Sequence, residues 1–352
     1  MSICAANTLD VKCTEATNIP ISYTCAVISV ILVVFTVPSN FTIILSIMRK
    51  GRLLQRNFYF IICNIAIADL VCAILTGPIS INLHMKQTNP KYHFPEADKH
   101  VLHLSFFITN GVSVLSMAAL SIDRLGVLLY PFFYYEKVTR FRTMVILLLT
   151  WVVSLGMGLS YLCFGYIRYL TIFSVMTVML TMLVMIATMV LFKYRLMQSI
   201  RTHQFRPQPA SSSSSATNAD PPNMTREGQH RSLNHFTQVD QKITKTFLWM
   251  LLLFLVNYLP AMIAATYINI CTDCPCSVVH LMRDVVFLSI LTSGLFRAVL
   301  FISRLEVLRT AICEMAGRLW ESVSSKDTIQ RVYFRSSSNR ANADEEGKGM
   351  NG

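Results

Sequence analysis

Seven predominantly apolar stretches follow one another along the chain, separated by polar segments. A helix of about 20 such residues crosses the hydrocarbon layer of a bilayer, so each stretch is long enough to span a membrane. Strand-type alternation of polar and apolar residues is missing, which argues against a membrane β-barrel. The pattern predicts an all-α membrane protein, a seven-transmembrane helix bundle over residues 21–303. The stretches are Ile21–Met48, Phe58–Leu83, His100–Ile122, Thr143–Phe164, Tyr169–Phe192, Phe247–Ile270 and Val285–Ser303.

The polar segments divide the rest of the chain. We expect residues 1–20 to form an extracellular N-terminus, with the first apolar stretch serving as its own signal anchor. Residues 196–245 contain Ser211–Ser215 and Pro221-Pro222. Such a composition buries too little apolar surface to offset chain entropy, so this cytoplasmic loop is expected to be disordered. The same applies to the tail, residues 322–352.

Residues 304–321 show a different pattern. Apolar residues recur there at spacings of three and four, which predicts a short amphipathic helix lying in the membrane interface. Cys313 stands beside its apolar side and is a candidate for palmitoylation. The apolar positions are Leu305, Leu308, Ile312, Met315 and Leu319.

The distribution of charged residues predicts how the chain is oriented in the membrane. Hydrophobic residues make up 53% of the chain and charged residues 14%, and the net charge is +12. The loop after the first stretch carries Arg49, Lys50, Arg52 and Arg56 without an acidic residue. Because short basic loops stay in the cytosol, we expect a multi-pass protein of the cell membrane with its N-terminus outside and its C-terminus inside. This asymmetry explains the positive charge without a nucleic-acid partner.

Five cysteines fall in segments predicted to be extracellular, an oxidising compartment: Cys4, Cys13, Cys271, Cys274 and Cys276. They are disulfide candidates, and their connectivity stays open. A zinc site built from the last three is the alternative, which we consider less favoured, so no metal site is predicted.

Several short motifs stand at regular depths within the apolar stretches. They are Asn40, NIAIADL with Asp69, SIDRLGVLLYP with Asp123, Arg124 and Pro131, Trp151, and FLVNYLP with Phe254 and Pro260. Together they resemble the rhodopsin-like (class A) G-protein-coupled receptors over Asn40 to about Cys313. The resemblance implies a heterotrimeric G protein, arrestin and receptor kinases as partners, a lipid bilayer as surroundings, and neither enzymatic activity nor a cofactor.

Some of these residues are expected to act as an activation switch. Pro260 lacks an N–H group and should kink the sixth helix, giving a lever whose cytoplasmic end can swing. The resemblance implies that Asp123, Arg124 and Asp240 form a latch that holds the inactive state. The alternatives are that Arg124 extends to the interface, and that Asp240 is a solvated acid favoured by the helix dipole.

Asp69 and Arg297 are two charges in the second and seventh stretches. Many members of the family bind sodium at the position of Asp69, with the help of residues matching Ser113 and Ser293. The fixed positive charge of Arg297 would repel that ion. We expect Arg297 to pair with Asp69 and tie the two helices together. The alternative is that Arg297 extends about 10 Å to the cytosolic interface.

Within the family, the melanocortin-like subgroup is the nearest in pattern, through FYFIICNIAIADL and a very short fourth-to-fifth connection. Family tyrosines are replaced by Leu125 and Val190, and the seventh-helix motif reads Arg297-Ala298-Val299-Leu300-Phe301. Since these hydroxyls support the active state in the family, a weakly signalling or decoy receptor, or a membrane scaffold, is the alternative function. A transporter is less favoured, because neither inverted repeats nor broken helices are seen.

The candidate ligand pocket is rich in aromatic residues, with Lys99 and Arg283 nearer its rim. No deep carboxylate is expected to face it, so a small apolar or amphipathic ligand, with an anionic head at the rim, fits better than an amine. The alternative is that these side chains are simply core. The candidate ligand-binding residues are His103, Phe106, Phe107, Asn110, Tyr258, Met262 and Phe287.

Overall fold

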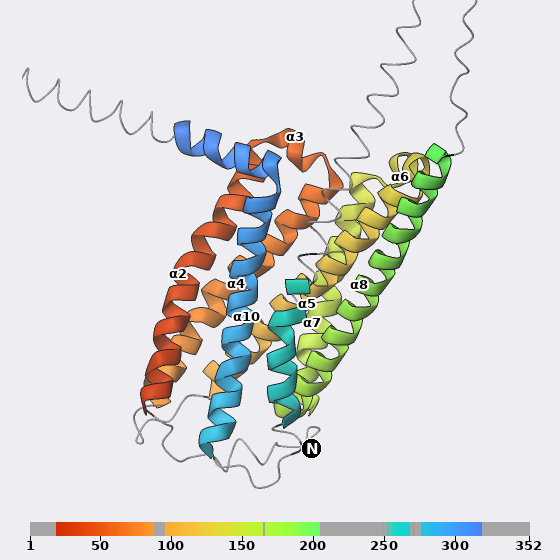
Figure 1. The fold of residues 1–352 in the computed structure, drawn as a ribbon. Helices are drawn as coiled ribbons and strands as arrows, with labels where there is room; N and C mark the ends of the chain where they lie inside the picture. The colour runs from red at the N-terminus through yellow and green to blue at the C-terminus, as the bar shows by residue number, and fades with distance from the viewer. Residues whose placement is uncertain are drawn as a thin grey trace, which may run out of the picture.

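The computed structural model describes residues 19–87, 96–164, 166–204, 249, 252–253, 255–267, 270 and 276–318. Apart from short connecting residues, this part of the chain is helical and contains no strand. Six of its helices are long and apolar enough to cross a membrane. They run side by side as a bundle (Figure 1), and the chain is a multi-pass membrane protein.

The six long helices extend past the predicted apolar stretches at one or both ends, because a helix continues into the polar interface region on either side of the hydrocarbon. Their bounds are α2 Ile19–Arg49, α4 Asn57–Gln87, α5 Glu96–Leu129, α7 Arg140–Phe164, α8 Tyr166–Gln204 and α10 Cys276–Arg304. The connection between α7 and α8 is as short as expected, since α8 begins two positions after α7 ends.

The predicted sixth span is described in part. Residues 255–267 form a helix that continues through Pro260, as α2 continues through Pro38 and α4 through Pro78. Phe254 lies outside the described residues. Proline is tolerated inside such helices because neighbouring groups satisfy the freed carbonyl.

Two short helices, α3 (Gly51–Leu54) and α6 (Pro131–Lys137), lie at one end of the bundle. This is the end predicted to face the cytosol. A further helix at residues 306–318 follows α10 at the same end and turns away from its axis (Figure 1). It lies within the amphipathic segment predicted at residues 304–321. Lys50, beyond α2, forms an ion pair of 2.9 Å with Glu314 on this helix.

The centre of the bundle is formed by α4 and α5. In an 18-residue apolar segment of each of these helices, 61% and 67% of the residues are buried, compared with 28% in the corresponding segments of α2 and α7. The less buried helices expose apolar side chains outward, as expected of surfaces that face lipid. The buried apolar residues form two clusters. One contains Phe106, Tyr161 and Phe287, and the other contains Phe58, Ile62 and Phe301 toward the predicted cytosolic end.

Candidate functional site

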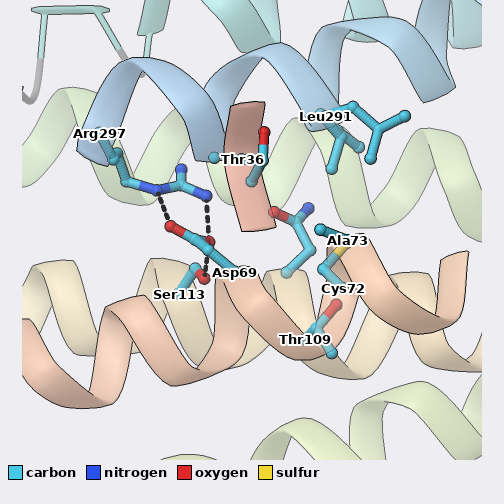
Figure 2. Close-up of a pocket in the computed structure, with 11 residues that line it drawn as sticks. Thr36, Asp69, Cys72, Ala73, Thr109, Ser113, Leu291 and Arg297 are labelled. Carbon is cyan, nitrogen blue, oxygen red and sulfur yellow. Dashed lines mark hydrogen bonds and ion pairs between the residues drawn. The ribbon is translucent and has the colours of Figure 1, made fainter. Parts of the chain in front are cut away.

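Asp69 on α4 and Arg297 on α10 form a bidentate ion pair inside the bundle. Arg297 donates from Nε to Asp69 Oδ2 at 3.0 Å and from Nη2 to Oδ1 at 2.6 Å. Both residues are 4% exposed, and their side chains point toward one another (Figure 2). The expected contact is therefore present, and the alternative in which Arg297 extends to the interface is not what the structure shows.

Two serines also form hydrogen bonds with this pair. Ser113 on α5 donates to Asp69 Oδ1 at 2.9 Å, and Arg297 Nη1 donates to Ser293 Oγ at 2.6 Å. Three helices thus meet at one carboxylate. The guanidinium occupies both oxygens of Asp69 and balances its charge, so the residues present do not fit a sodium ion at this carboxylate.

A small cavity lies beside the pair. Its volume is about 10 Å³, which is enough for about one water molecule. Asn110, 3% exposed, has no hydrogen-bond partner for either amide atom, and the Thr36 hydroxyl likewise has none in the described part of the chain. Figure 2 shows part of the lining between α4 and α10. The cavity is lined by Thr36, Asp69, Cys72, Ala73, Thr109, Asn110, Ser113, Ile290, Leu291, Gly294 and Arg297.

The candidate ligand-binding residues lie together, in the half of the bundle toward the predicted extracellular end. Phe106, Phe107, Tyr258 and Phe287 are each at most 2% exposed and belong to one cluster. Met262 is partly buried against that cluster. These side chains are packed against one another, which agrees with the reading of them as core, and Asn110 lies on the neighbouring cavity. Their role in binding stays a prediction.

His103 connects this aromatic cluster to two other helices. Its Nδ1 lies 3.1 Å from the hydroxyl of Tyr161 on α7, and its ring stacks on Phe287 of α10 at 6.3 Å. Nδ1 of His100 also lies 3.1 Å from the same hydroxyl. A phenolic hydroxyl donates one hydrogen bond and accepts others, so at least one of the two imidazoles must donate to Tyr161.

Asp123 and Arg124 lie at the predicted cytosolic end of α5. Arg124 donates to Asp123 Oδ2 from Nε at 3.0 Å and from Nη2 at 2.5 Å. Its guanidinium also lies over the ring of Phe58, 4.4 Å from the centroid. Asp240, the proposed third member of the latch, is outside the described residues, so the contact between helices three and six stays a prediction.

Tyr134 on α6 is a partner of Asp123 that the sequence did not suggest. Its hydroxyl donates to Asp123 Oδ1, and a Cβ atom at Gly126 would lie 2.8 Å from its ring. Glycine at position 126 therefore lets the ring approach α5. Burial, followed by the negative charge of Asp123, raises the pKa of Tyr134 above its ordinary value, which keeps the hydroxyl protonated as a donor.

Other predicted residues are not placed by the structure. Cys4, Cys13, Cys271 and Cys274 lie outside the described residues, and so does the side chain of Cys276. The disulfide predictions therefore stay open. Cys313 is exposed on the helix at residues 306–318.

Sequence reasoning missed one buried carboxylate. Asp284, 1% exposed, lies near the start of α10 and contacts His84 of α4. Asp284 contacts His84 and Arg283, so the expectation that no deep carboxylate faces the candidate ligand pocket stays a prediction. Asp284 borders the predicted seventh stretch next to Arg283, and neighbouring opposite charges at a span end usually indicate the polar interface. A histidine directly after the second predicted stretch, His84, was the available signal for a buried partner.

The sequence of this chain is similar to those of known membrane receptors. The model of the 7 transmembrane receptor (rhodopsin family) matches residues 39–295. An octopamine receptor beta-2R of Chilo suppressalis is 27% identical over 34% of this chain and 30% of its own length. A prostaglandin E2 receptor EP4 subtype of Bos taurus is 27% identical over 40% of this chain and 27% of its own length. A dopamine D2-like receptor of Drosophila melanogaster is 27% identical over 38% of this chain and 14% of its own length.

The chain thus spans less than a third of the length of these relatives. The similarities do not confirm the resemblance to the melanocortin-like subgroup. The matching proteins are receptors, in agreement with the expectation that the chain is not an enzyme.

Proposed function

Because the chain belongs to the rhodopsin family of seven-transmembrane receptors, we propose that it transduces the binding of an extracellular amphipathic ligand to a heterotrimeric G protein. One observation carries the proposal, namely that a single helix, α5, links three parts of the bundle. It carries Phe106 of the aromatic cluster with His103 stacked on Phe287, Ser113 against Asp69, and the Asp123–Arg124 pair at the opposite end. A displacement of this helix at one end is transmitted to the other end, since packed helices move as rigid elements.

The ligand class follows from the charges around the aromatic cluster. Lys99 and Arg283 both act electrostatically on His103, and both are cationic. The carboxylate of Asp284 lies 3.4 Å from His84 and 3.9 Å from Arg283, so two basic side chains of the protein already lie within ion-pair distance of it. An apolar chain with an anionic head matches this rim better than an amine. Among the relatives, this favours the class of the prostaglandin E2 receptor over that of the octopamine and dopamine receptors.

Ligand-dependent stabilisation tests the ligand class directly. A ligand that binds only the folded state at 100 times its Kd stabilises that state by about 2.7 kcal/mol. We expect oleate, used as an anionic probe with an apolar chain, to raise the unfolding midpoint of the purified receptor, and octopamine and dopamine to leave it unchanged. Lys99→Ala and Arg283→Ala should reduce the oleate effect. Stabilisation by the amines alone would overturn the anionic assignment.

The second candidate is a receptor that binds ligand and signals weakly. The Asp69–Arg297 pair supports it, because a bidentate buried contact between α4 and α10 resists any rearrangement that separates the two helices. Leu125, Val190 and Phe301 stand where the family has tyrosines. Ligand stabilisation without G-protein activation would favour this candidate over the first.

A further inference from the structure

His84 on α4 and Asp284 on α10 lie in contact between the two helices near their predicted extracellular ends. Nδ1 of His84 is 3.4 Å from Oδ1 of Asp284, and the two side chains are 0% and 2% exposed. The other ring nitrogen, Nε2, lies 3.3 Å from the hydroxyl of Ser80, one turn earlier on α4. Both nitrogens of the imidazole therefore face polar groups of the protein.

The charges around this contact are mostly cationic. Arg283 lies 3.9 Å from Asp284 Oδ1, and its Nη2 is 2.8 Å from Nδ1 of His280. The first helix, α2, contributes the Cys25 thiol, which interacts electrostatically with Asp284, and has no charged residue between Ile19 and Met48. In the described part of this end, other charged or ionisable side chains include Lys86 on α4, Asp98, Lys99, His100 and His103 on α5, and Arg168 near the start of α8.

A buried carboxylate and an imidazole within ion-pair distance are most stable when the pair carries one proton in total. With that proton on the ring the contact is an ion pair, and with it on the carboxyl the contact joins two neutral groups, so neither form leaves an unbalanced charge. A second proton produces an imidazolium facing a neutral acid, with Arg283 close by. The attraction is then lost, and two cations remain in a buried site.

We propose that His84 and Asp284 form a proton-binding site through which the receptor responds to extracellular pH. The site joins α4 to α10 when it holds one proton and releases them when it takes up a second. The contact is therefore present at neutral pH and is lost as the pH falls. The two groups titrate as a coupled pair, and because one of them is a histidine, the transition is sought between about pH 5 and 8.

The proposal is tested by thermal unfolding of the purified full-length receptor at about pH 7.5 and about pH 5.5. We expect the unfolding midpoint to fall on acidification by about 3 °C or more, and we expect Asp284→Asn to remove most of that change. Unfolding is the readout because it does not depend on a ligand or on coupling to a G protein. The outcome is thus separate from the fate of the proposed function.

Asp98→Asn is the matched control, because Asp98 is an acid at the same end that lies near the start of α5 and is partly exposed. It should retain the pH response of the wild type. His84→Gln carries the test if Asp284→Asn does not fold, since it removes the other half of the site. A wild-type midpoint that is the same at both pH values, or an unchanged response in both His84→Gln and Asp284→Asn, would overturn the proposal.

Discussion

Asp69 and Arg297 are 228 positions apart in the chain and are joined by two hydrogen bonds of 2.6 and 3.0 Å. The pair lies between the aromatic cluster and the Asp123–Arg124 pair. An ion pair at this depth is retained only with its partner present, because either charge alone would be buried without compensation. This contact is therefore a buried, bidentate polar link between α4 and α10.

Asp69→Asn and Arg297→Gln should each destabilise the receptor by about 3–5 kcal/mol, because each leaves the other charge unpaired. The double variant should lose clearly less than the sum of the two single losses. Thermal unfolding of the four proteins measures this coupling. The control is the pair Lys50–Glu314, whose side chains are 37% and 44% exposed and whose coupling should be at most about 1 kcal/mol. Additive losses at Asp69 and Arg297 would rule out a direct interaction.

Sodium should have no specific effect on the wild-type protein, since the guanidinium of Arg297 already occupies the carboxylate of Asp69. Replacing sodium by choline at constant ionic strength should leave the unfolding midpoint unchanged. Arg297→Asn removes the competing charge, so this variant should become more stable in sodium than in choline. A sodium effect in the wild type that is equal to that of the variant would contradict the assignment.

Tyr134→Phe should destabilise the protein by about 1.5–3 kcal/mol, because the hydroxyl donates to the ionised and buried Asp123. The control variant is Tyr130→Phe, since Tyr130 is 67% exposed. It should change the unfolding midpoint little. Equal losses in the two variants would show that the contact with Asp123 contributes nothing.

Trp151→Phe should cost about 1 kcal/mol beyond the loss of packing, because the indole Nε1 donates to Asn64 Oδ1 at 3.0 Å. The amide of Asn64 in turn donates to Ser116 at 2.8 Å, so the bond links α7 to α4 and α5. Trp249→Phe, at a position that is 46% exposed, is the control. A smaller effect at Trp151 than at Trp249 would disagree with this network.

Cys313→Ser should abolish most labelling by a palmitate analogue in cells. The thiol is exposed on the helix at residues 306–318, which lies at the end predicted to face the cytosol. Cys163 is also exposed and free but stands near the opposite end of α7, so Cys163→Ser should retain the label. Full labelling of Cys313→Ser would exclude this site.

The helices could be predicted because the bilayer sets one length scale and apolar stretches of that length stand out in the sequence. The contact of Arg297 with Asp69 could be predicted for a related reason, since a charge at that depth must find a partner. The resemblance to the receptor family also implied that the second and seventh helices are neighbours in the bundle, so their residues could be expected to meet.

The partners of Asp123 and Asp284 could not be predicted in the same way. Tyr134 reaches Asp123 because α6 folds back beside Gly126, and the direction of such a short helix depends on tertiary packing. Asp284 stands at a span boundary, where the sequence does not distinguish a solvated acid from one that turns inward. The arrangement of His100 and His103 around Tyr161 depends in addition on the rotation of α5 about its axis.

The most direct test of the account is nucleotide exchange on purified G proteins of several classes, added to membranes with and without the receptor. We expect membranes containing the wild type to accelerate exchange on at least one class when oleate is present. Arg124→Ala, which removes the cationic group at the predicted cytosolic end of α5, should be inactive while still reaching the membrane. Equal exchange with the wild type, with Arg124→Ala and with empty membranes, across all classes, would contradict the claim that this bundle transmits a signal.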